Sequence, residues 1–307
     1  MLKIYFRSLK DKELHKIDKV KPGAWIFAYD LQDDELEQLK DLGFDEDLLE
    51  DALDFYEVPH VEYEDGINYF FTRYVLEADK QNAATAPVMI AVSDKYILTV
   101  SHGKPEFLDD FAHRRDDAVS TQKIKFFLLM MDRIVIRYEK SLTEIRRRLS
   151  RFLRSLESVS DKDLKEIVKI ESRLTDYISA LVPTAASLKD MIARKKTLTL
   201  HSDDVDILED LMLDIEQIID NAKSVYKTAQ NVRATHEVIL GHQLNATMKT
   251  LTALTIILAI PTILSGFFGM NVWLPLSDGP QSFFFVLFLI LLLSAIVTYF
   301  FKRKSWL

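Results

Sequence analysis

Two long apolar runs near the C-terminal end of the sequence constrain this chain more than any other feature. The first covers residues 251–271 (LTALTIILAIPTILSGFFGMN), and the second covers residues 282–301 (SFFFVLFLILLLSAIVTYFF) without a single charge. Each run is about as long as is needed to cross the hydrocarbon core of a bilayer. In lipid, a helix satisfies its backbone hydrogen bonds within its own segment. The two runs therefore predict a transmembrane hairpin after a charged body.

The flanking charges predict the orientation of this hairpin. No basic stretch followed by an apolar core precedes the body, so we expect the body to stay in the cytosol. The second run is followed by Lys302, Arg303 and Lys304, and positively charged flanks favour the cytosolic side. We therefore expect a multi-pass protein of the cell membrane, with both termini cytosolic and the loop of residues 269–281 outside.

Composition and missing motifs exclude several classes of protein. The chain has no cysteine, which excludes disulfides and thiolate metal sites. A formal net charge of −8 argues against nucleic acid as a partner, because phosphate binding needs a basic face. The sequence contains no Walker loop, no Gly-x-Ser-x-Gly and no His-Glu-x-x-His, and its histidines are scattered. We therefore do not expect an enzyme.

The first part of the body alternates between strand and helix signals. Strands are predicted at residues 3–7, 24–29, 58–63, 67–77, 88–92 and 96–101, where β-branched and aromatic residues gather. Helices are predicted between them, at residues 33–42, 45–55 and 105–114. Residues 1–118 are thus expected to form a cytosolic α/β domain with a mixed sheet.

After this domain the pattern is helical. Residues 119–202 are predicted to form a helical bundle, with helices at 123–156 and 161–195. Ser202 and Asp203 are suited to cap a stalk helix of residues 203–268, which would run on into the first transmembrane helix. Such a helix is about 90 to 100 Å long, and we expect other helices to pack along its length. Transmembrane helix 2 (282–301) and a basic tail (302–307) complete an α+β architecture that we expect to form an oligomeric funnel.

The stalk helix carries two different stripes. Steps of three and four select a weakly polar stripe that includes Asp210, Gln217, Asp220, Ser224, Lys227, Asn231, Asn245, Met248, Thr252, Thr255, Ala259, Thr262 and Gly266. Small residues and threonines of this kind suit the packing of membrane helices, but they also suit a pore formed by several copies. The neighbouring apolar stripe is the predicted packing face, which frees the weakly polar one to line a lumen: Leu211, Ile215, Ile218, Ala222, Val225, Ala229 and Val232.

A three-residue motif adds a family resemblance. Gly269-Met270-Asn271 stands where the first span meets the outside, before a short loop and a second span. This arrangement resembles the CorA family of divalent-cation channels, whose hallmark is Gly-Met-Asn at this place. The resemblance covers the whole architecture and is weakest in the α/β domain, where residues 48–51 (LLED) and 59–62 (PHVE) look like the family pattern.

The resemblance implies a homopentamer in a lipid bilayer that conducts Mg²⁺. Gly269, Met270 and Asn271 would form the selectivity region, with neutral oxygens binding the hydrated ion through its water shell. Met248 and Leu251 would be hydrophobic constrictions that gate by dewetting. The pore-lining positions would be Asn245, Met248, Leu251, Thr252, Thr255, Ala259, Thr262 and Gly266.

The resemblance also implies regulation by cytosolic Mg²⁺. Asp51 and Asp210 match acidic positions with which the family senses divalent ions between subunits, and Asp214 and Asp220 lie nearby in the sequence. Bound Mg²⁺ would bridge neighbouring subunits and keep the stalks closed, and its loss would let the carboxylates repel. The alternative is that these acids are ordinary solvated helix faces.

Departures from the family pattern leave the ion preference open. Phe268 and Val272 flank the motif where the family usually has Tyr and Phe, and Asp278 is the only acid of the outer loop. Co²⁺, Ni²⁺ and Zn²⁺ remain alternatives to Mg²⁺, and a zinc or cobalt transporter of the same fold is the nearest rival. A non-conducting, membrane-anchored divalent-cation sensor is the rival from another class.

Overall fold

The computed structural model describes residues 1–11, 13–76, 84–105, 108, 111, 118–154, 160–193, 201–270 and 281–307. The chain divides into two compact units, Met1–Val232 and Arg233–Leu307. The boundary falls inside one long helix, α6 (Ser202–Phe268), so no loop separates the two units.

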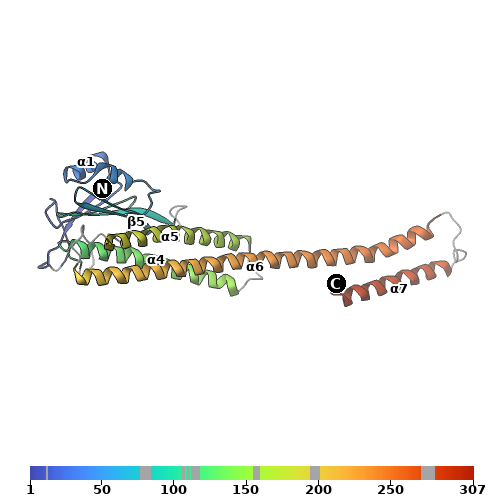
Figure 1. The fold of residues 1–307 in the computed structure, drawn as a ribbon. Helices are drawn as coiled ribbons and strands as arrows, with labels where there is room; N and C mark the ends of the chain where they lie inside the picture. Colours follow the sequence, from blue (N-terminus) through green and yellow to red (C-terminus); the bar gives the residue numbers. More distant parts are fainter. Residues whose placement is uncertain are drawn as a thin grey trace. The chain divides into compact units, whose positions relative to one another are not determined.

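A mixed seven-stranded sheet forms the centre of the first unit, as predicted (Figure 1). Its order is β2-β1-β3-β7-β6-β5-β4, and only β3 and β7 run parallel. In chain order the strands are β1 (Leu2–Phe6), β2 (His15–Lys16), β3 (Trp25–Tyr29), β4 (Val61–Glu64), β5 (Ile67–Val75), β6 (Thr85–Val92) and β7 (Ile97–Ser101).

Helices cover both faces of this sheet. On one face lie α1 (Asp33–Asp41) and α2 (Glu46–Asp51), and on the other lie α4 (Lys123–Arg154), α5 (Asp161–Ala193) and the first part of α6 (Figure 1). Side chains alternate along β3, so Ile26 joins the core under α1 and α2 while Trp25 and Phe27 join the core under the long helices. The buried indole of Trp25 donates to Thr99 Oγ1 at 2.9 Å, which satisfies its polar atom.

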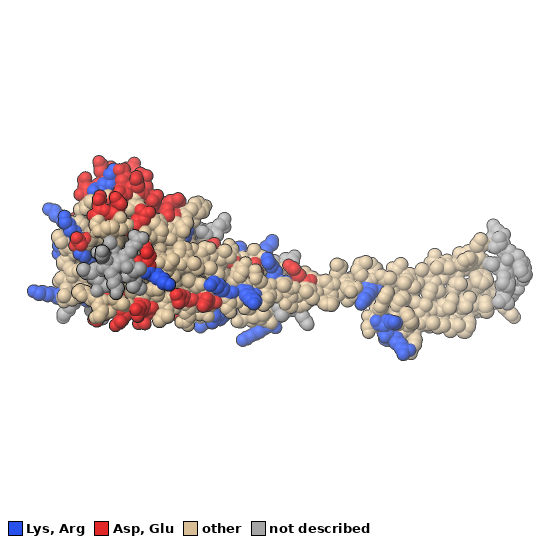
Figure 2. Space-filling model, in the orientation of Figure 1, with Lys and Arg blue, Asp and Glu red and all other residues tan. Residues whose placement is uncertain are grey.

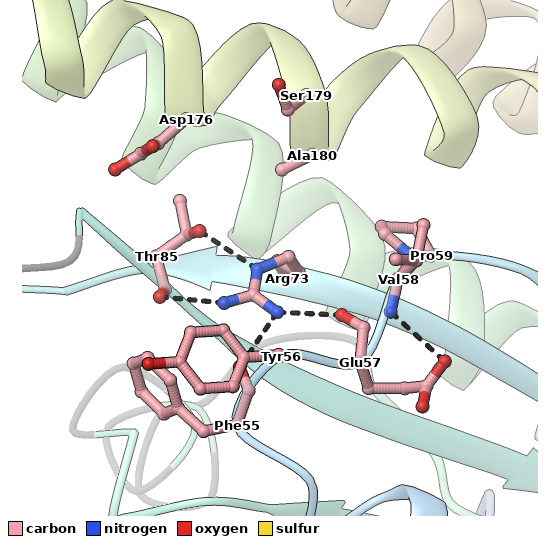
Figure 3. A pocket seen from close by; sticks show the side chains of 10 residues that line it. All are labelled: Phe55, Tyr56, Glu57, Val58, Pro59, Arg73, Thr85, Asp176, Ser179 and Ala180. Carbon is pink, nitrogen blue, oxygen red and sulfur yellow. Dashed lines mark hydrogen bonds between the residues drawn. The ribbon is translucent and has the colours of Figure 1, made fainter.

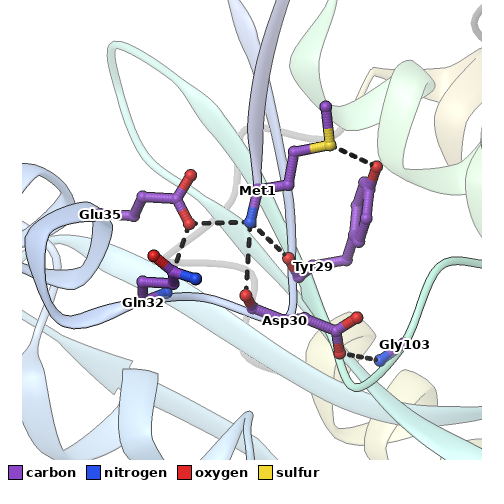
Figure 4. A network of polar contacts seen from close by, with 6 residues as sticks. All are labelled: Met1, Tyr29, Asp30, Gln32, Glu35 and Gly103. Atoms are coloured by element: carbon purple, nitrogen blue, oxygen red, sulfur yellow. Dashed lines mark hydrogen bonds and ion pairs between the residues drawn. The ribbon is translucent and has the colours of Figure 1, made fainter.

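The ends of β1, β3 and α1 meet in a small polar network (Figure 4). The amino group of Met1 donates to the carbonyl oxygen of Tyr29 and to Oε2 of Glu35, both at 2.7 Å. Burial alone would raise the pKa of Glu35, but the hydrogen bonds from Met1 and from the Gln32 N–H outweigh it and lower the pKa. The Asp30 carboxylate accepts from the N–H of Gly103 at 2.8 Å and joins the loop after β7 to the network.

Several element boundaries differ from the sequence prediction. The strand β2 was not predicted, because two exposed polar residues carry no strand signal; it exists through pairing with β1. The strand predicted at 58–63 is β4, which begins at Val61. The helix predicted at 45–55 is shorter, since α2 is followed by tight turns in which the Leu53 and Asp54 N–H groups bond three residues back. The helix predicted at 105–114 lies outside the described residues except at Pro105, Leu108 and Phe111.

The two-stripe prediction for α6 is confirmed at its packing face. All seven residues of the apolar stripe are buried in the core with α4 and α5: Leu211, Ile215, Ile218, Ala222, Val225, Ala229 and Val232. The helix cap was predicted at Ser202 and Asp203, but in the structure it lies one residue earlier, at His201. The carbonyl of His201 accepts from the Asp204 and Val205 N–H groups, and the Asp204 carboxylate accepts from the His201 N–H at 3.2 Å.

Candidate functional site

Two helices of the described residues are long and apolar enough to cross a membrane, the second part of α6 and α7 (Gln281–Arg303). The second is slightly longer than predicted, because the helix continues through Lys302 and Arg303. Figure 2 shows Asp and Glu side chains gathered over α1 and none along the apolar part of the visible face. Residues 251–270 and 281–301 contain no Asp or Glu, so these segments present no carboxylate to a bilayer.

The described residues leave most of the weakly polar stripe of α6 exposed. Seven of the eight predicted pore-lining side chains are exposed, and Ala259 is half-buried. Met248 and Leu251 are 53% and 56% exposed although both are apolar. The exposed seven are Asn245, Met248, Leu251, Thr252, Thr255, Thr262 and Gly266.

The opposite face of the same helix is the shielded one. Ala253 is fully buried, and the partly buried residues other than Ala259 recur with it at helical spacing: Ile257, Ile260, Pro261, Leu264 and Phe268. At about 100° per residue, their mean direction is about 180° from that of the weakly polar stripe. On α7 the shielded residues also lie on one side of the helix: Ser282, Val286, Leu289, Ile290, Ser294, Val297, Thr298 and Phe301. The hairpin thus leaves the weakly polar stripe free.

The threonines of the stripe offer oxygen lone pairs to their surroundings. Thr252, Thr255 and Thr262 each donate their hydroxyl hydrogen to the backbone carbonyl four residues earlier, at 2.8, 2.8 and 3.2 Å. A hydroxyl used in this way keeps its acceptor lone pairs for other partners. Water molecules around a cation point their hydrogens outward, so a row of neutral acceptors suits a hydrated cation.

The first two residues of the Gly-Met-Asn motif end α6. The N–H of Gly269 bonds to the carbonyl of Ser265 at 2.9 Å, and the N–H of Met270 to that of Phe267 at 3.3 Å. A Cβ at position 269 would lie 3.1 Å from the Ser265 oxygen, which explains why glycine fits this helix end. Asn271 and Asp278 lie outside the described residues.

The four predicted sensor carboxylates do not meet within one chain. Asp51, Asp210, Asp214 and Asp220 are all exposed, and Asp220 lies 3.6 Å from Lys223. Asp51 belongs to α2 and Asp210 to α6, which pack on opposite faces of the sheet. No group of three or more His, Asp or Glu side chains that could hold a metal exists among the described residues. A site built from Asp51 and Asp210 therefore needs more than one chain.

A cavity of about 250 Å³ lies between the loop of residues 55–59, β5 and α5 (Figure 3). It is less suitable as a functional site than the stripe of α6. Its central cation, Arg73, donates to Thr85 Oγ1 and to the carbonyls of Thr85, Phe55 and Glu57, at 2.7–3.1 Å. Burial lowers the pKa of this guanidinium, which the four neutral acceptors stabilise. Arg73 is thus engaged in holding the loop on the sheet.

One contact of the hairpin was missed from the sequence. Thr250 Oγ1 donates to the backbone carbonyl of Trp306 at 3.1 Å and joins the end of the chain to α6. The sequence gives no sign of this contact, since a backbone acceptor leaves no trace in side-chain periodicity.

Comparisons with known proteins agree with this architecture. The family model described as "CorA-like Mg2+ transporter protein" matches residues 21–303. The cobalt/magnesium transport protein CorA of Methanocaldococcus jannaschii is 27% identical over 297 residues, covering 92% of this chain and 91% of that protein.

Solved structures show the same fold. The complete structure of the CorA magnesium transporter from Methanocaldococcus jannaschii matches with a TM-score of 0.85 at 23% identity, over 100% of this chain and 99% of that one. The full-length CmaX protein matches with a TM-score of 0.77 at 14% identity, over 98% of this chain and 96% of that one. The whole chain, hairpin included, therefore follows a fold already seen in full-length structures.

Proposed function

This chain belongs to the CorA-like Mg²⁺ transporter family, and from that premise we propose that it is a homopentameric Mg²⁺ channel of the cell membrane. One observation supports the pore above all others. Apart from the half-buried Ala259, the weakly polar stripe of α6 is exposed along the apolar span, while the other shielded residues lie on the opposite face. Around a shared axis, the same stripe from several chains encloses a lumen lined by hydroxyl and amide groups.

The chemistry of this lining suits a hydrated divalent cation. Mg²⁺ gives up its water reluctantly, so neutral oxygens can hold the ion through its hydration shell. Thr252, Thr255 and Thr262 supply such oxygens, and Asn271 adds an amide at the outer mouth, next to the glycine and methionine that end α6. A ring of carboxylates would hold the ion more tightly and slow its release.

The apolar residues of the stripe provide the gate in this proposal. Met248 and Leu251 are exposed apolar side chains one turn apart, at the end of the span nearer the cytosolic domain. When the helices stand close together, rings of these side chains expel water and block ions. A small separation of the stalks rewets the constriction.

Cytosolic Mg²⁺ controls this separation in the same proposal. Asp51 and Asp210 are exposed on opposite faces of their unit, which allows the Asp51 of one subunit to approach the Asp210 of a neighbour. A bridging Mg²⁺ offsets their repulsion and holds the stalks together. Both termini are cytosolic, as the basic residues at the end of α7 favour.

Asp210→Ala tests this regulation. We expect the variant to conduct at internal Mg²⁺ concentrations that close the unaltered channel, with the inhibitory concentration raised by about tenfold, since losing about 1.4 kcal/mol of binding corresponds to that factor. Mg²⁺ entry into proteoliposomes of varied internal Mg²⁺ measures the effect. Glu216→Ala, an exposed acid of the same helix, is the matched control. If internal Mg²⁺ inhibits Asp210→Ala as strongly as the unaltered channel, the sensor hypothesis is wrong, and the pore proposal is unaffected.

The transport proposal itself is tested with purified protein in liposomes that contain a Mg²⁺-sensitive dye. We expect external Mg²⁺ to enter down its gradient, and parallel assays with Co²⁺, Ni²⁺ and Zn²⁺ rank the alternatives. Zn²⁺ entry without Mg²⁺ entry would favour the zinc transporter. No entry of any of these ions, together with Mg²⁺ binding to the protein, would favour the non-conducting sensor.

A further inference from the structure

The chain turns back on itself after α7 through a regular cap. Ser305 has a φ of 55°, in the left-handed region, and its N–H bonds to the carbonyl of Lys302 at 3.2 Å. The N–H of Trp306 bonds to the carbonyl of Phe301 at 3.0 Å. These two bonds and the left-handed residue define a Schellman motif. We name residues 301–306 the hook.

The hook contacts α6 at one place. The rings of Phe301 and Trp306 are stacked, with centroids 5.3 Å apart and planes at 17°. Phe301 is the most shielded residue of α7, and the Trp306 carbonyl accepts the hydroxyl hydrogen of Thr250 at 3.1 Å. Ala253, one turn further along the same face of α6, is fully buried. The hook thus meets α6 at Thr250, one turn before the buried Ala253.

The hydroxyl of Thr250 is directed differently from those of its neighbours. Thr247, Thr252 and Thr255 each donate to the carbonyl four residues earlier in their own helix, at 3.0, 2.8 and 2.8 Å. Thr250 donates to Trp306 in another segment of the chain instead. A threonine that leaves the usual partner for a distant carbonyl indicates a specific contact between the helices.

This contact lies behind the proposed constriction. Thr250 stands between Met248 and Leu251 in the sequence, and at about 100° per residue the Thr250–Ala253 face points about 180° from the stripe. We infer that the hook is a positioning element that sets the rotation of α6 about its own axis and so keeps Met248, Leu251 and Thr255 turned toward the lumen. The inference rests on the proposed pore, because a lumen gives the rotation a functional meaning.

A positioning element of this kind is needed because the span is surrounded by lipid. Lipid tails are as apolar as leucine, so burial in the membrane gives an apolar helix little preference for one rotation. Along α6 the stripe is flanked by Leu254, Ile256 and Leu258, which are as apolar as lipid. The hydrogen bond from Thr250 to Trp306, in a hook held by the stacked Phe301 and Trp306 rings, favours one rotation of α6 about its axis. A rotation by one residue, about 100°, would replace the stripe in the lumen with apolar side chains.

A single-cysteine probe tests the hook in the full-length protein. The chain has no cysteine, so Thr255→Cys introduces the only thiol. We expect a charged methanethiosulfonate reagent to modify this thiol in proteoliposomes. Thr250→Val is expected to slow the modification by about fivefold, the factor that corresponds to one lost hydrogen bond. Trp306→Ala keeps the backbone carbonyl but removes the ring stacked on Phe301, and is also expected to slow the modification. Thr250→Ser and the matched control Thr247→Val are expected to keep the original rate.

A second pair of variants changes the hook without touching α6. Glycine suits the left-handed position 305 and a β-branched residue resists it, so Ser305→Val is expected to slow modification and Ser305→Gly to preserve it. If Trp306→Ala does not reach the membrane, the Ser305 variants and Thr250→Val test the inference without it. If Thr255→Cys reacts equally fast with and without the hook substitutions, the inference about the hook is wrong, and the pore proposal is unaffected. An unreactive Thr255→Cys in the otherwise unaltered chain would contradict the pore itself.

Discussion

Asn271→Ala is expected to reduce Mg²⁺ entry by about 30-fold or more, since two lost hydrogen bonds at about 1 kcal/mol each correspond to that factor. The amide contacts the water shell of the incoming ion in our proposal, and alanine offers no polar atom in its place. Initial rates of Mg²⁺ entry into proteoliposomes measure the loss.

Two comparisons make this result specific. Asn271→Gln keeps the amide on a longer side chain and is expected to retain more activity than Asn271→Ala. Asp278→Asn, a change in the same outer loop, is expected to have a small effect, because physiological salt screens charges that are more than about 8 Å apart in water. Full activity in Asn271→Ala would place the entrance of the pore elsewhere.

Thr255→Lys is expected to abolish conduction. Its side chain belongs to the uncovered stripe, in the apolar span. An ammonium group a few ångströms from a divalent cation costs several kcal/mol even at an effective dielectric constant of about 20, and every subunit contributes one. A loss of more than about 100-fold in Mg²⁺ entry follows, since each 1.4 kcal/mol is a factor of ten.

The matched control at the same position is Thr255→Val, which has nearly the same shape and no charge. It removes a hydroxyl whose hydrogen bonds to the carbonyl of Leu251, and is expected to change Mg²⁺ entry only a few-fold. Membrane insertion and subunit assembly of both variants are checked by size-exclusion chromatography in detergent. Robust Mg²⁺ entry through the lysine variant would contradict a lumen at this level.

The sheet and the long helices were predictable because their signals are local. The β-branched and aromatic residues of β3 and β5 and the helical periodicity of α4, α5 and α6 can be read from a single sequence. The strand β2 was not predictable, since its two polar residues are held only by partners on β1. The early end of α2 was missed for a similar reason: apolar Leu53 and Phe55 continue the helical pattern, but the backbone leaves the helix after Asp51.

The site was predictable in part. The apolar stripe of α6 could be identified as a packing face, because its spacing matches one side of a helix, and the structure confirms it. The hook could not be identified, since its Schellman motif has Ser305 at the position where glycine is the usual signal. The function of the pore-lining residues stays a prediction, because a single chain does not contain the neighbours that would complete a lumen.

The most direct test of the account is a cysteine scan along the apolar part of α6 in membranes. Each single-cysteine variant is treated with a charged, membrane-impermeant thiol reagent, and Mg²⁺ entry is measured before and after. We predict that modification blocks entry at Thr252, Thr255 and Thr262. We predict no reaction at Ile257, Ile260 and Leu264, which lie on the shielded face. The reverse pattern, or no reaction at any of these positions, would contradict a water-filled lumen along the weakly polar stripe.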